Sequence, residues 1–329
     1  MAQYPEMRLR RLRRTAGVRR LLDAPPPGLE KFLWPVFVAP GRRRLDPLAS
    51  MPGQFRYSPD TLLKALEKPV AAGLGGVLIF GVPGDVPKDN HGRAAADPKG
   101  VVQDTVRKMR RAFPELPIFT DVCLCAYTDH GHCGPLDDGG AVDNDAALEQ
   151  LAAVAVSHAE AGASAVAPSA MMDGQVRAIR VALDRAGLGE TILMSYSTKF
   201  ASSLYGPFRE AEGSAPRHGD RRGYQASPAN PRLALRESAL DEAEGADILM
   251  VKPALFYLDL LRQLRDRTEL PLAAYNVSGE YAMLCAAAAA GYGDLRAMVR
   301  ESLGSIARAG ADVIISYWAS RYGEIFGEG

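Results

Sequence analysis

Apolar residues fall in short runs along this chain, and most runs are followed by a stretch with apolar residues at helical spacing. Such runs are typical of strands that are buried on both faces of a parallel sheet. We predict strands at residues 34–39, 76–82, 117–124, 165–168, 192–197, 246–251, 270–277 and 311–318. The intervening patterns predict amphipathic helices at residues 61–72, 101–112, 145–161, 174–186, 231–244, 257–267 and 295–309.

This alternation continues without a break in composition, and it predicts a single α/β domain, a (β/α)8 TIM barrel over residues 31–329. A doubly wound open sheet is the second possibility. It is disfavoured because no Gly-x-Gly-x-x-Gly turn follows a strand and no phosphate-binding Gly-x-x-x-x-Gly-Lys loop occurs. In a barrel the active site lies at the carboxyl ends of the strands.

Two of the predicted strands lead into a lysine, Lys199 and Lys252. Burial disfavours the ammonium form, and two neighbouring ammonium groups also depress each other's pKa, so the amines become nucleophilic near neutral pH. A lysine whose stem packs while its amine reaches solvent is the alternative for Lys252 alone. The pair indicates amine chemistry on a carbonyl substrate.

Other reactive side chains also fall at predicted strand ends. Asp121 and Cys123 lie in the third strand, Ser278 follows the seventh and Tyr317 lies in the eighth. In a barrel these side chains would meet the two lysines on one face.

Three cysteines, Cys123, Cys125 and Cys133, lie within eleven residues. Cysteine thiolates select zinc over magnesium or calcium, and three ligands leave a coordination position open for water or substrate. His130 or His132 could supply a fourth ligand, which would make the site structural rather than catalytic. We predict a zinc site here. Cys285 lies in an alanine-rich helical stretch and is expected to be a buried apolar thiol.

Two segments lie outside the barrel pattern. Residues 1–30 are rich in arginine and end at a Pro-Pro-Pro-Gly break, which predicts an arm that packs on a neighbouring subunit. Residues 200–231 are rich in glycine, proline and arginine and are too long for an ordinary loop, which predicts a lid over the catalytic face. Arginines in such a lid suit a substrate that carries carboxylates. A solvated surface loop is the alternative.

The bulk composition excludes several partners. Lys plus Arg and Asp plus Glu both number 39, so the formal net charge is zero and binding to nucleic acid or to an anionic membrane is not expected. No apolar run reaches the roughly 20 residues of a membrane span, and the N-terminus lacks the apolar core of a signal peptide. Clustered cysteines of this kind suit a reducing compartment, so we expect a cytoplasmic protein.

These motifs together resemble the porphobilinogen synthase (5-aminolevulinate dehydratase) family nearly end to end. The most specific matches are Met-Val-Lys-Pro at 250–253, Gly-Asp-Arg-Arg at 219–222 and Val-Ser-Gly-Glu at 277–280, with residues 121–134, 195–209 and 314–317. The resemblance implies the condensation of two 5-aminolevulinate molecules to porphobilinogen in tetrapyrrole synthesis, by a barrel that usually assembles as a homo-octamer through its arms.

The resemblance also implies a role for individual residues. Lys252 and Lys199 would form Schiff bases with the substrates of the P site and the A site, and Asp121 would carry protons. The P-site carboxylate would bind Ser278 and Tyr317, and the A-site carboxylate would bind Arg209, Arg221 and Gln225. The three cysteines match the zinc-dependent branch of the family, which favours a catalytic metal site over a structural one.

Two further positions are informative. Glu237 matches a position at which many bacterial relatives bind an allosteric magnesium ion, and an ordinary surface glutamate is the alternative. Ala170 stands where the family usually has an aspartate, which removes a carboxylate near the fourth strand.

Two alternative functions stay open. A lysine-dependent class I aldolase needs one Schiff-base lysine and no thiolate metal, and an inactive zinc-bound scaffold would be expected to lack part of the set. Activity towards 5-aminolevulinate would separate them.

Overall fold

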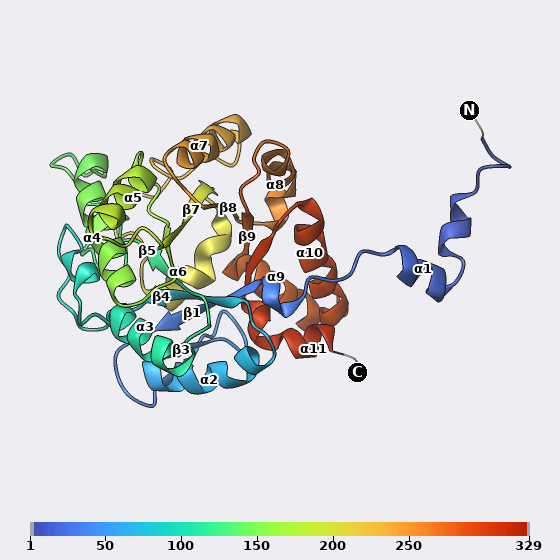
Figure 1. Cartoon of the computed structure of the whole chain (residues 1–329), viewed down its shortest axis with the longest axis horizontal. Helices are drawn as coiled ribbons and strands as arrows, with labels where there is room; N and C mark the ends of the chain where they lie inside the picture. Colours follow the sequence, from blue (N-terminus) through green and yellow to red (C-terminus); the bar gives the residue numbers. More distant parts are fainter. Residues whose placement is uncertain (1–2, 328–329) are drawn as a thin grey trace.

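Eight parallel strands close into a barrel in the computed structural model, which describes residues 3–327 (Figure 1). The strands follow one another around the barrel, and pairing of the last with the first closes it. They are β1 (Phe32–Val38), β4 (Gly76–Gly81), β5 (Ile118–Val122), β6 (Ala165–Pro168), β7 (Ile192–Lys199), β8 (Ile248–Lys252), β9 (Leu272–Asn276) and β10 (Val313–Ser316). The predicted (β/α)8 barrel is therefore confirmed.

Helices surround the barrel, and most of them bury apolar residues against it. In α3 (Val101–Ala112), Val102, Val106 and Met109 are buried while Lys108 is exposed, which is the spacing that predicted the helix. The other barrel helices are α2 (Pro59–Ala71), α4 (Asn144–Glu160), α5 (Gln175–Arg185), α7 (Pro231–Ala243), α8 (Leu258–Arg265), α9 (Ser278–Ala289) and α10 (Leu295–Ala309).

The predicted strands and helices agree with the structure to within two residues at each end. The pattern did not predict the small antiparallel pair β2 (Leu45–Pro47) and β3 (Phe55–Tyr57), which extends the sheet beside β1, or α11 (Tyr322–Phe326). These elements are too short for a hydrophobic period to be visible. Short 3-10 helices complete the fold: η1 (Leu9–Arg13), η2 (Leu29–Lys31), η3 (Arg93–Ala96), η4 (Ser203–Tyr205), η5 (Leu255–Tyr257) and η6 (Tyr317–Arg321).

The N-terminal segment reaches away from the barrel (Figure 1). Its elements, η1 and α1 (Ala16–Leu22), bury none of their residues within this chain. The arm was predicted over residues 1–30 and the barrel to residue 329; residues 1, 2, 328 and 329 lie outside the described part. Within residues 3–327, no helix combines the length and apolarity that are needed to cross a bilayer.

The predicted lid is a folded segment with little regular structure. It leaves β7 at Phe200, which forms a bridge with Ala226, and it contains η4 and the short helix α6 (Gly206–Glu212) before α7 begins. Helix α6 packs against α9, and the guanidinium of Arg56, from β3, donates hydrogen bonds to the carbonyl of Ala211. The lid therefore rests on two separate parts of the barrel.

Candidate active site

The two predicted lysines end adjacent strands. Lys199 is the last residue of β7 and Lys252 the last residue of β8, and they are paired directly across the two strands. Both side chains are buried, with 5% and 4% of their surface exposed. Because parallel strands present their carboxyl ends at one face, the fold brings both amines to the mouth that the lid covers.

Aromatic rings surround the amine of Lys252. Its Nζ lies 4.3 Å from the centroid of the Tyr275 ring, 4.9 Å from that of Tyr196 and 5.0 Å from that of Phe208. Burial, followed by the like charge of Lys199, lowers the pKa of Lys252 to about 7. The lowered pKa leaves part of the amine unprotonated near neutral pH, and attack on a carbonyl substrate requires the unprotonated form.

Lys199 is held by backbone rather than by a carboxylate. Its Nζ donates a hydrogen bond of 2.5 Å to the carbonyl of Ser169, just beyond β6. Among residues 3–327, no carboxylate lies within ion-pair distance of this amine. The neighbouring Ala170 is completely buried and leaves no acidic group at this position.

Asp121 lies on β5 with one carboxylate oxygen buried and without a hydrogen-bond partner in the described chain. Burial, followed by the negative charge of Glu212, raises the pKa of Asp121 to about 7, although Lys199 opposes the shift. A carboxyl group with this pKa can both take up and release a proton near neutral pH.

The three clustered cysteines meet as predicted. The sulfur atoms of Cys123, Cys125 and Cys133 all lie within 4.8 Å of one another, and all three side chains are buried and free of disulfides. Three soft sulfur donors at this spacing fit a zinc ion. Cys285, by contrast, is half-buried on α9 and lies outside the cluster.

The histidines do not complete the thiol cluster. His130 uses Nε2 with the side chain of Asn90 and Nδ1 with the backbone N–H of His132. His132 uses Nδ1 with the hydroxyl of Tyr224 and Nε2 with the carbonyl of His218. Since both rings are engaged elsewhere, the geometry favours three thiols over a closed site with a histidine ligand.

Three side chains of the lid have buried polar atoms that lack a partner within residues 3–327; Arg221 and Gln225 are buried and Arg209 is half-buried. These atoms are Nε of Arg209, Nε of Arg221 and both amide atoms of Gln225. Arg221 is anchored by hydrogen bonds from Nη2 to the carbonyls of Gly131 and Ser214. Buried polar groups are nearly always satisfied, and free guanidinium and amide donors of this kind suit a carboxylate-bearing ligand.

Ser278 and Tyr317 lie on the Lys252 side of the site. The hydroxyl of Tyr317 is 3.4 Å from that of Tyr275, the ring nearest Lys252. The hydroxyl of Ser278 accepts a hydrogen bond of 3.1 Å from the backbone N–H of Phe208, whose ring also faces Lys252. Both residues are buried, and each lies next to a residue whose ring faces Lys252.

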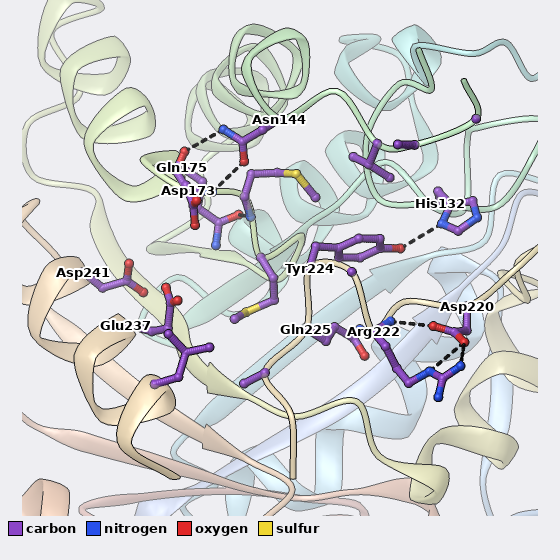
Figure 2. A pocket seen from close by; sticks show the side chains of 18 residues that line it. His132, Asn144, Asp173, Gln175, Asp220, Arg222, Tyr224, Gln225, Glu237 and Asp241 are labelled. Atoms are coloured by element: carbon purple, nitrogen blue, oxygen red, sulfur yellow. Dashed lines mark hydrogen bonds and ion pairs between the residues drawn. The ribbon is translucent and has the colours of Figure 1, made fainter. Parts of the chain in front are cut away.

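Glu237 lies half-buried on α7, away from the two lysines. It lines a cavity of about 530 Å³ that Gln225 of the lid also lines, and its carboxylate lies near those of Asp241 and Asp173 (Figure 2). Burial, followed by the charge of Asp173, raises the pKa of Glu237. An ordinary exposed glutamate would not show this environment.

The sequence analysis missed Glu212. This residue ends α6, is 5% exposed, and its carboxylate contacts Cys125 at 3.6 Å. Nothing in the sequence separates it from Glu210, two residues earlier, which is exposed. Only the path of the lid turns one of these side chains inward.

The fold and the site together define a class of enzyme. A parallel barrel with two buried, facing lysine amines under an arginine-bearing lid is a lysine-dependent enzyme that acts on carbonyl compounds.

The chain belongs to the delta-aminolevulinic acid dehydratase family, whose family model matches residues 6–325. It is 52% identical to the delta-aminolevulinic acid dehydratase of Methanothermobacter thermautotrophicus over 319 residues, covering 96% of each chain. It is 51% identical to the Escherichia coli protein of that name over 312 residues, covering 95% of each chain. A crystal structure of the Toxoplasma gondii protein with the reaction product porphobilinogen superposes with a TM-score of 0.94 at 41% identity, covering 97% of this chain and 91% of the other.

Proposed function

We propose that this enzyme condenses two molecules of 5-aminolevulinate to porphobilinogen with the loss of two waters. One observation carries the proposal. Lys199 and Lys252 are paired across adjacent strands, so that two ketone substrates can be bound covalently side by side. We further propose two carboxylate-binding sets, Ser278 and Tyr317 for the substrate at Lys252 and Arg209, Arg221 and Gln225 for the substrate at Lys199, as a reaction that joins two copies of one keto acid requires.

The first substrate binds at Lys252. The free amine attacks the ketone carbon, and loss of water leaves an iminium that serves as an electron sink for the adjacent carbon. The hydroxyls of Ser278 and Tyr317 hold the substrate carboxylate. The rings around Lys252 exclude water and so protect the iminium from hydrolysis.

The second substrate binds at Lys199, beneath the lid. Arg209, Arg221 and Gln225 direct their unpartnered donors to its carboxylate, which anchors its far end while the ketone meets the amine. Positioning of both ketones in one chamber turns a bimolecular condensation into an effectively intramolecular one.

Zinc is the metal that the three thiols suit, and when bound at Cys123, Cys125 and Cys133 it supplies a Lewis acid beside the second substrate. Asp121 takes up the proton that the substrate amine loses before carbon–nitrogen bond formation. Its pKa of about 7 lets it return that proton to a leaving water.

Reductive trapping tests the proposal. The enzyme is incubated with 5-aminolevulinate and cyanoborohydride, and reduced adducts are located by peptide mass spectrometry. We expect adducts on Lys252 and on Lys199, and porphobilinogen in the absence of reductant. An adduct on one lysine without porphobilinogen would indicate an aldolase, and no adduct would indicate an inactive scaffold. Either result refutes the proposal.

We also propose that Glu237 binds an allosteric magnesium ion. The support is its position beside two further carboxylates in a cavity that can hold a hydrated ion. The zinc-loaded enzyme should gain activity on addition of magnesium, and Glu237→Gln should abolish the gain while retaining the basal rate. An equal response of the variant and the parent would contradict this assignment.

The arm supports a homo-oligomer, and we propose the octamer of the family. Tyr4, Leu9 and Leu21 expose 77%, 67% and 81% of their surface on a segment that touches little of its own barrel. Removal of residues 1–24 should yield a smaller assembly by light scattering with an intact barrel by circular dichroism. An unchanged mass would exclude the arm from assembly. Free clustered thiols support a location in the reducing cytoplasm.

A further inference from the structure

Glu212 is a buried carboxylate that the reaction scheme does not use. Both of its polar contacts within residues 3–327 are made through Oε2, which accepts a hydrogen bond from the hydroxyl of Ser214 and lies 3.6 Å from the sulfur of Cys125. The residue is carried by the end of α6 into the wall of the active site.

This carboxylate has no cationic partner in the described chain. No lysine or arginine among residues 3–327 lies within ion-pair distance of it. Arg221, the nearby buried cation, instead donates its hydrogen bonds to the carbonyls of Gly131 and Ser214. Buried ionised carboxylates are paired with cations or coordinate metals. The two donors that Glu212 has here, the hydroxyl of Ser214 and the thiol of Cys125, are weak substitutes for either.

The contact with Cys125 has the length expected for two ligands of one tetrahedral zinc. With Zn–S near 2.3 Å and Zn–O near 2.1 Å, tetrahedral angles place the sulfur and the oxygen about 3.6 Å apart. Glu212 also lines a small cavity of about 10 Å³ together with Cys123 and Asp121. In this structure the carboxylate contacts Cys125 but does not lie within 4.8 Å of all three sulfur atoms. Ligation therefore requires its side chain to turn towards Cys123, into the small cavity that both residues line.

We propose that Glu212 is a fourth protein ligand of the metal, so that the site consists of three thiolates and one carboxylate in the absence of substrate. The inference rests on the proposed zinc site. A purely structural role, in which Glu212 only anchors Ser214 and the lid, predicts instead that metal binding is independent of the carboxylate.

Cobalt(II) separates the two roles, because its visible absorption reports the ligand set and geometry without any turnover. The full-length enzyme is stripped of metal and titrated with cobalt, and then with zinc against a chromophoric chelator. The test variants are Glu212→Gln, which is nearly isosteric, and Glu212→Ala. Glu210→Gln on the same helix is the matched control, since Glu210 is exposed. Circular dichroism and thermal unfolding of each metal-free variant monitor the fold.

We expect both Glu212 variants to bind cobalt and zinc at least tenfold more weakly, by analogy with losses at metal sites. The cobalt bands should shift in position and intensity, and the control should match the parent. Equal affinity and identical spectra in parent and variants would overturn the role of Glu212 but leave the zinc site intact. Failure of the parent itself to bind cobalt or zinc would overturn both proposals, whereas it would leave the lysine chemistry untouched.

Discussion

Replacement of Lys199 by glutamine should make Lys252 a poorer nucleophile at neutral pH. The pKa of Lys252 is about 7 against an ordinary 10.5, a difference equivalent to about 5 kcal/mol between its two protonation states. Burial is the largest cause and the like charge of Lys199 is the second. We assign to the like charge on the order of 2 kcal/mol, as expected for two ammonium groups roughly 8 Å apart at an effective dielectric constant near 20.

The sign follows from the charge that is removed. Without the Lys199 charge, the ammonium form of Lys252 is less disfavoured, so its pKa rises by roughly 1.5. At pH 7 the fraction of free amine falls from about one half to a few per cent, and the rate of imine formation at Lys252 should fall roughly fifteenfold. At pH 9.5 the two enzymes should react at similar rates.

The assay is the initial rate of adduct formation on Lys252 with 5-aminolevulinate and cyanoborohydride, measured by peptide mass spectrometry from pH 5.5 to 9.5. Lys199→Arg is the matched control, because it removes the second nucleophile but keeps the positive charge, and its midpoint should stay near 7. Identical midpoints in the glutamine and arginine variants would refute the charge coupling. A parent midpoint near 10 would refute the burial argument as well.

Three further changes test the lid, the thiol cluster and the barrel. Arg221→Gln should raise the KM for 5-aminolevulinate about ten- to a hundredfold, since a buried charged hydrogen bond contributes about 1.5–3 kcal/mol. Arg222 is exposed and paired with Asp220, so the control Arg222→Gln should leave the KM unchanged. Equal KM values in the two variants would exclude carboxylate binding by Arg221. After dialysis, the Cys133→Ser variant should no longer hold one zinc ion per chain, as measured by atomic absorption, whereas the Cys285→Ser control should still hold it. Zinc bound equally by both variants would show that Cys133 is not a metal ligand. Leu62→Ala, at a completely buried position of α2, should lower the free energy of unfolding by about 2–5 kcal/mol in urea titrations, and a loss below 1 kcal/mol would contradict close packing there.

The fold could be predicted from the sequence because a barrel strand needs an almost continuous apolar run. Strand β1, for example, is buried at all seven positions, and no other regular element produces that pattern between helical stretches. The short pair β2 and β3 escaped prediction since its three-residue strands are mostly exposed or half-buried and carry no period.

The sequence predicted the site residues where a reactive side chain falls on a predicted strand or at its end. Lys199, Lys252 and Asp121 lie on strands, so their direction follows from the sheet. Cys133 lies in a loop, and its prediction depended on the scarcity of cysteine in the chain. The family resemblance, rather than any physical pattern, selected Arg209, Arg221 and Gln225 from the lid.

The sequence alone determined the barrel, the strand ends that carry the reactive groups and the three thiols of the proposed metal site, because these depend on local periodicity and side-chain chemistry. Only the tertiary structure decided the pKa of Lys252, which is set by rings from other strands and by the lysine of the adjacent strand. It also decided which lid glutamate faces the thiols. Burial and the proximity of charges depend on residues distant in the chain, and no local pattern encodes them.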